Sequence, residues 1–89
     1  MHPPLVHLVG AGPGDADLLT LRAARLLQIA DVVVHDRLVG ESVLELCNPK
    51  AQRIDVGKAA GRHALSQDAI NELLAGLAAP DRVVVRLKG

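Results

Sequence analysis

The sequence contains no phenylalanine, tyrosine or tryptophan, and only one cysteine, Cys47. Without aromatic side chains the chain offers no stacking platform for single-stranded nucleic acid and no aromatic cage for a cation. A single cysteine excludes an internal disulfide and a cysteine-based zinc site, so Cys47 is expected to be a small buried hydrophobic residue. The four histidines include no ligand-spaced pair, and no metal site is predicted.

The sequence also lacks net charge and long apolar runs. Ten basic residues balance ten acidic ones, which gives no general attraction to nucleic acid or to an anionic membrane. No apolar run approaches the roughly 18 residues of a membrane span, and the N-terminus does not resemble a signal peptide, so a cytoplasmic location is expected. Hydrophobic residues make up 49% of the 89 residues, which excludes a disordered chain and predicts one small domain with an aliphatic core.

Apolar segments with strand character alternate with segments of helical periodicity. Strands are predicted at 5–9, 32–34, 52–56 and 83–87, and helices at 21–30, after Ser42 and after Ser66. Thr20 and Ser66 are predicted N-caps, and Ser42 with Glu45 predicts a capping box. This order predicts an α/β fold, a parallel sheet with alternating helices. The apolar fourth strand at the chain end predicts an exposed edge, which suggests a truncated domain.

Ligands of open parallel sheets bind beyond the carboxyl ends of the strands. In this sequence those ends lead into the loops 10–15, 35–40 and 57–63, and into a fourth loop that begins at Lys88. The topology alone therefore predicts Pro13, Asp36, Lys58 and Gly89 on one edge of the sheet.

The first of these loops is Gly10-Ala-Gly-Pro-Gly-Asp15. A dinucleotide fingerprint would have glycine where Asp15 stands, and Pro13 removes one backbone donor of the kind that cradles a diphosphate. Glycines such as Gly12 let a ligand approach the backbone closely, so the loop suits a nucleoside without phosphate better. A tight strand-to-helix turn explains the glycines equally well.

Asp36 is either an ordinary turn residue at a strand end or a general base. Lys58 is either a solvated surface lysine or an acid or cation that meets a substrate carboxylate. Together with Arg37, Arg62 and His63, Lys58 would give a neutral protein a local basic rim, which suits a small polyanionic substrate. The alternative is that these residues only keep the loops soluble.

Four stretches of the sequence resemble the signatures of the tetrapyrrole methylases, and among them of the uroporphyrinogen-III C-methyltransferases. The first is Val9-Gly-Ala-Gly-Pro-Gly-Asp15, followed by Asp17-Leu-Leu-Thr-Leu-Arg-Ala-Ala24. The others are Ala30-Asp-Val-Val-Val-His-Asp-Arg-Leu-Val39, then Gly57-Lys-Ala-Ala-Gly-Arg-His63 with Gln67, Ile70 and Asn71, and finally Val85-Arg-Leu-Lys-Gly89. The stretches keep the family's order and spacing over nearly the whole chain.

The resemblance implies that residues 1–89 are the amino-terminal part of a methylase domain whose second domain is absent. Such enzymes are homodimers that bind S-adenosylmethionine between two α/β domains and methylate uroporphyrinogen III at C2 and C7, giving precorrin-2 for sirohaem and cobalamin. An electron-rich pyrrole carbon can attack the sulfonium methyl group without a metal, and a carboxylate can accept the proton that the ring must lose. The 89 residues alone are expected to be inactive.

The resemblance also assigns roles to individual residues. Pro13 and Gly89 match cofactor-loop residues, and Gly12 is expected beside them. Asp36 matches the proton acceptor and Lys58 the proton donor. The basic residues of the loops, which are Arg37, Arg62 and His63, would then hold the eight carboxylates of the substrate. Histidine at position 35, where many relatives have tyrosine, is expected to tune the pocket.

Three other interpretations stay open. In a dinucleotide-binding module Asp36 would hold a ribose hydroxyl, although Asp15 counts against that motif. An inactive remnant would serve only in association with other chains. A sister methylase would act on a later corrin intermediate or on diphthine. The sequence leaves undecided whether the methylase stands alone or is part of a sirohaem synthase, and which pathway it serves.

Overall fold

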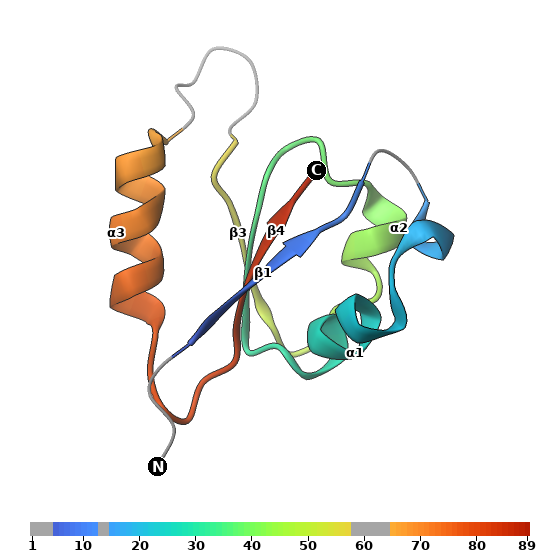
Figure 1. The fold of residues 1–89 in the computed structure, drawn as a ribbon, viewed down its shortest axis with the longest axis horizontal. Helices are drawn as coiled ribbons and strands as arrows, with labels where there is room; N and C mark the ends of the chain where they lie inside the picture. The colour runs from blue at the N-terminus through green and yellow to red at the C-terminus, as the bar shows by residue number, and fades with distance from the viewer. Residues whose placement is uncertain (1–4, 13–14, 58–64) are drawn as a thin grey trace.

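The computed structural model describes residues 5–12, 15–57 and 65–89, which form a parallel four-stranded sheet between two layers of helices (Figure 1). The strands are β1 (Val6–Gly10), β2 (Val32–His35), β3 (Gln52–Asp55) and β4 (Val84–Lys88). The helices are α1 (Leu21–Ile29), α2 (Glu41–Leu44) and α3 (Gln67–Leu77), with a short 3-10 helix, η1, at Ala16–Leu18. The predicted α/β fold with a parallel sheet and alternating helices is confirmed.

The strand order is β1-β4-β2-β3, so the last strand lies inside the sheet. β4 pairs with β1 on one side and with β2 on the other. The prediction that this strand is an exposed edge is therefore wrong. Val84, Val85 and Leu87 are fully buried, because β4 is paired on both sides and covered on both faces. The sequence of such a strand is a nearly continuous run of apolar residues. Among the described residues β1 and β3 are the edges.

Each face of the sheet has its own aliphatic core, and Figure 1 shows α3 on one face and α1 with α2 on the other. Val33, Val85 and Leu87 face α1 and α2, where Leu27 and Val43 are fully buried. On the opposite face the buried residues are Val32, Val34, Val56, Val84 and, from α3, Ile70 and Leu74. Side chains alternate between the faces of each strand, and this alternation divides the valines between the two cores.

Cys47 is buried in the core under α1 and α2, as predicted. Burial raises the pKa of its thiol, and the charge of nearby Arg53 offsets this only in part. The thiol therefore stays protonated at neutral pH and behaves as a small hydrophobic group.

Local capping explains where two of the three helices begin. Thr20 accepts a hydrogen bond from the Ala23 N–H (3.0 Å), and Ser66 accepts one from the Ala69 N–H (3.1 Å), so both predicted N-caps are confirmed. The capping box at Ser42 is wrong, since α2 has Gly40 as its N-cap. The Ser42 hydroxyl instead accepts a bond from the Ala16 N–H (3.3 Å), which ties η1 to α2.

Candidate functional site

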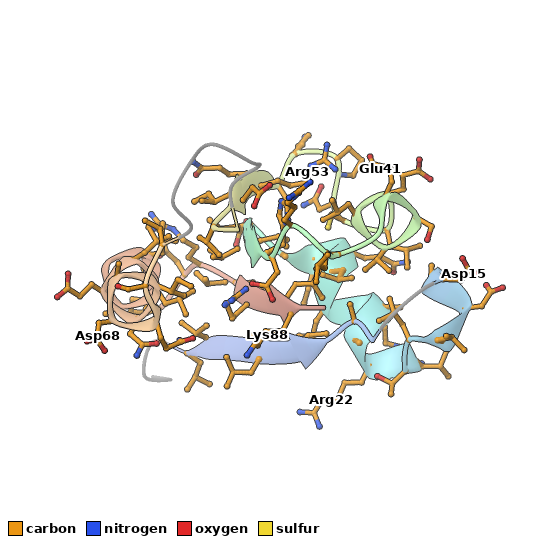
Figure 2. The ribbon with its side chains drawn as sticks, turned by 90° about the horizontal axis from the view of Figure 1, so that it is seen from above. Asp15, Arg22, Glu41, Arg53, Asp68 and Lys88 are labelled. Atoms are coloured by element: carbon orange, nitrogen blue, oxygen red, sulfur yellow. The ribbon has the colours of Figure 1, made fainter. Side chains whose placement is uncertain are left out.

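The loops that follow the strands meet at the carboxyl edge of the sheet. Because all four strands are parallel, Gly12, Asp36, Gly57 and Gly89 follow the same ends of β1, β2, β3 and β4. Figure 2 views the molecule from above, and Lys88 lies near its middle, between α3 with Asp68 and the segment with Asp15. Of the other predicted site residues, Arg37 directly follows Asp36 in the described loop, whereas Pro13, Lys58, Arg62 and His63 lie outside the described residues.

Backbone hydrogen bonds hold these loops together. The Ala11 N–H donates to the Lys88 carbonyl (2.6 Å), which joins the loop after β1 to the end of β4. The Asp36 N–H donates to the Leu87 carbonyl (3.3 Å), which joins the loop after β2 to the same strand. The structure thus brings together Gly12, Asp36 and Gly89, three of the predicted site residues, on one edge.

Asp36 makes an ion pair with Arg86 of β4. The Arg86 Nη2 lies 2.6 Å from the Asp36 Oδ1, and the two side chains are 4% and 29% exposed. The Gly89 N–H donates a longer bond, 3.3 Å, to the Asp36 Oδ2. A charge-assisted bond of this length is strong, so the carboxylate has a fixed place at the edge of the sheet.

The surroundings of Asp36 favour its ionised form. Burial by itself raises the pKa of the carboxyl, but the hydrogen bonds from Arg86 and Gly89 and the charges of Arg86 and Lys88 outweigh burial and lower it below its ordinary value. A lowered pKa in the folded state stabilises the protein above the pKa of the unfolded chain, and that stabilisation is lost as the pH falls through the folded value. Asp36 is therefore a carboxylate at neutral pH.

Two glycines let the loop after β2 fit between its neighbours. A Cβ on Gly57 would lie 2.8 Å from the Arg37 backbone nitrogen, which is closer than such atoms approach. A Cβ on Gly89 would lie 3.3 Å from the Leu38 Cβ. Close packing against both neighbouring strand ends therefore positions the loop that carries Asp36.

Replacement of Gly57 by alanine is expected to destabilise the protein by about 1–3 kcal/mol, because the new methyl group would push against the backbone at Arg37. Gly76 in α3 is the matched control, since a Cβ there meets nothing within 4 Å. Gly76→Ala should raise stability by about 0.5–1 kcal/mol, because glycine is a poor helix former. Urea unfolding of both variants measures the difference, and equal stability of the two would contradict the close contact.

Two further residues, His35 and Arg86, contact Asp36. His35 is buried (8%), and its Nδ1 lies 3.1 Å from the Asp36 carbonyl, so its ring packs inside the fold. The sequence motifs predict no role for Arg86. The feature of the sequence that points to Arg86 is a single cation within an apolar strand, because a buried arginine requires hydrogen-bonding partners.

A hollow of about 350 Å³ lies beside the edge strand β1, lined by residues of β1 and α1 that include His7, Gly10, Arg22 and Leu26. None of the predicted site residues that the structure describes lines it. Within the described part of the chain, no group of three or more His, Cys, Asp or Glu side chains could hold a metal ion. None of the described helices is long and apolar enough to cross a membrane.

Comparison with known proteins gives close relatives over nearly the whole chain. Siroheme synthase of Pseudomonas aeruginosa (strain LESB58) is 61% identical over 84 residues, which are 94% of this chain and 18% of that protein. Siroheme synthase of Azotobacter vinelandii (strain DJ / ATCC BAA-1303) is 60% identical, with the same coverage. The chain thus spans under a fifth of the length of these relatives.

Solved structures of similar proteins also match nearly the whole chain. A uroporphyrin-III-C-methyltransferase of Thermus thermophilus superposes with a TM-score of 0.79 at 45% identity, over 97% of this chain and 35% of that one. A structure of the Thermus thermophilus enzyme complexed with S-adenyl homocysteine gives 0.76 at 51% identity, over 94% and 34%. The family Tetrapyrrole (Corrin/Porphyrin) Methylases matches residues 5–89. This chain therefore belongs to the tetrapyrrole methylases.

Proposed function

We propose that the full-length protein carrying this chain transfers methyl groups from S-adenosylmethionine to C2 and C7 of uroporphyrinogen III and so makes precorrin-2. The observation that carries the proposal is an ionised carboxylate, Asp36, held at the edge of the sheet where the glycine loop also lies. The names of the similar structures, a uroporphyrin-III C-methyltransferase and its complex with S-adenyl homocysteine, support the substrate and the cofactor.

The first loop fits a nucleoside cofactor that carries no phosphate. Gly12 has a φ of +68°, which side chains disfavour, and no atom of the described residues lies within 4 Å of the position that a Cβ would take. A Cβ on Gly10 would meet open space as well. We propose that Gly12, Pro13 and Gly89 line the cofactor side of the site, where bound S-adenosylmethionine would supply a methyl group on a sulfonium.

The chemistry that remains for the protein is to orient the substrate and to take up a proton. As the ring carbon forms its bond to the methyl group, the carbon–sulfur bond breaks, its electron pair stays on sulfur, and the tetrapyrrole becomes positively charged. Asp36 accepts the proton that the ring then loses. A carboxylate with a lowered pKa suffices for this step because a cationic ring is a strong acid, and the negative charge also stabilises the cation as it forms.

Basic groups around the same edge would hold the carboxylates of the substrate. Arg37 is exposed in the loop after β2, and Lys88 is exposed at the end of β4. We propose that Arg37, Arg62 and His63 bind substrate carboxylates and that Lys58 donates a proton. Since the chain spans about a third of the similar methyltransferase structures, residues 1–89 alone are expected to be inactive. We also propose, from the family resemblance, that the whole enzyme is a homodimer.

A calorimetric titration separates this proposal from a dinucleotide-binding module. The full-length protein should bind S-adenosylhomocysteine and show no heat of binding with NAD. Binding of NAD alone would reject the proposal, and binding of neither would leave the inactive remnant as the better interpretation. If the protein binds S-adenosylhomocysteine, tests with uroporphyrinogen III, later corrin intermediates and diphthine identify the substrate.

Gly12→Ala in the full-length protein is expected to weaken S-adenosylhomocysteine binding about tenfold or more. The added methyl group would make the positive φ unfavourable by roughly 1–2 kcal/mol and would occupy the open side of the loop. Gly76→Ala, on α3, is the control and should bind as the wild type does. Calorimetry measures both affinities, and equal affinity would remove Gly12 from the cofactor site.

A further inference from the structure

Arg86 is a buried cation with several fixed partners. It lies in β4 between the fully buried Val85 and Leu87, and only 4% of its surface is exposed. Its Nη1 donates to the carbonyl of Val34 (3.3 Å) and to that of Leu87 (3.1 Å). A buried guanidinium is costly unless its N–H groups are paired, and here two different strands pair them.

These bonds fix the plane of the guanidinium relative to the sheet. Nη1 is tied to the backbone of β2 and β4, so Nη2 has little freedom, and it holds the Asp36 Oδ1 at 2.6 Å. The other oxygen, Oδ2, accepts the longer bond of 3.3 Å from the Gly89 N–H. The two oxygens of one carboxylate are therefore unequal, with Oδ1 held firmly and Oδ2 held weakly.

We propose that Arg86 is a positioning residue, which anchors Asp36 to the sheet through Oδ1 and thereby presents Oδ2 to the proton of the methylated ring. This inference rests on the proposed function and adds to it the residue that orients the base. A flexible aspartate at a strand end would sample many orientations. The fork of hydrogen bonds from Arg86 selects one of them before the substrate arrives.

Lysine at position 86 would keep the charge but lose the geometry. Its ammonium group is a compact point charge on a flexible four-carbon stem and cannot hold two carbonyls and a carboxylate in the planar arrangement of the arginine guanidinium. Arg86→Lys therefore tests orientation separately from charge. Arg53→Lys is the matched control, since Arg53 is also a strand arginine but is exposed on β3.

The experiment measures methyl transfer from S-adenosylmethionine to uroporphyrinogen III by the full-length protein and both variants. Arg86→Lys should lower kcat about 10–100-fold with KM nearly unchanged, because misplacing a reacting group by about 1 Å can cost about 100-fold. Arg53→Lys should leave both parameters as they are.

The acid limb of the kcat profile should move to higher pH in Arg86→Lys, because the carboxylate has lost its hydrogen-bonding partner. Among the described residues, the titratable and charged groups at the strand ends and in the loop that meet at Asp36 are Arg86 and Lys88 of β4, Asp55 of β3, His35 of β2 and Arg37.

A second measurement needs no variant. Because the Gly89 N–H bonds to the Asp36 Oδ2, its amide proton shift should follow the ionisation of Asp36, and in the wild-type protein the pKa of that transition should be lower than the ordinary value of an aspartate. A transition that does not follow the ionisation of Asp36 or is not lowered, or an unchanged kcat in Arg86→Lys beside an active wild type, would overturn this inference alone. A wild type that transfers no methyl group would overturn the proposed function and the role of Arg86 with it.

Discussion

Asp36→Asn is expected to slow methyl transfer by the full-length protein about 10²–10⁴-fold, the range that general-base assistance typically contributes. Asparagine has nearly the same shape and keeps an oxygen that can accept the bond from Arg86, so the loop after β2 should hold its place. It removes the group that accepts the proton and the negative charge that faces the cationic ring. Single-turnover methylation with saturating cofactor measures the loss.

The control for Asp36→Asn is cofactor affinity, which calorimetry should find nearly unchanged with S-adenosylhomocysteine. Asp81→Asn makes the same chemical change at an exposed position of a turn and should methylate as the wild type does. If Asp36→Asn transferred methyl groups at the wild-type rate, Asp36 would be an ordinary turn residue at the end of a strand.

Leu87→Ala is expected to reduce the free energy of unfolding by about 2–5 kcal/mol, since Leu87 is fully buried in β4, one of the two inner strands of the sheet. Domains of this size have a total stability of roughly 4–13 kcal/mol, so the variant would lose a large share of it. Leu8→Ala is the matched control because Leu8 is 77% exposed on β1, and its effect should stay within about 0.5 kcal/mol.

Urea unfolding followed by circular dichroism compares the two leucine variants. A larger loss for Leu8→Ala than for Leu87→Ala would contradict the strand order, since it would mean that β1 and not β4 is buried on both sides. The comparison therefore tests the topology independently of any activity.

Features set by neighbouring residues could be predicted from the sequence, whereas features set by distant partners could not. Thr20 and Ser66 cap their helices through amides three residues away, so local pattern was enough to find them. The Ser42 hydroxyl accepts a bond from a residue 26 positions away, and this long-range contact replaced the expected capping box. The position of β4 between β1 and β2 likewise depends on pairings with strands far back in the sequence.

The candidate site likewise has features that the sequence could predict and others that depend on distant partners. Parallel topology predicted that the loops after the strands share one edge, and the structure places Gly12, Asp36 and Gly89 there. The ion pair that orients Asp36 joins residues 50 positions apart. A lone arginine in an apolar strand indicates that it needs a partner, but only the fold identifies which carboxylate it meets.

Mass spectrometry of uroporphyrinogen III after incubation with S-adenosylmethionine and the full-length protein tests the proposed function most directly. The proposed function predicts a product that has gained two methyl groups, with one S-adenosylhomocysteine formed for each methyl group transferred. It also predicts that the Asp36→Asn protein yields little product in the same time. An unmodified tetrapyrrole in the presence of folded wild-type protein that binds the cofactor would contradict the proposed function.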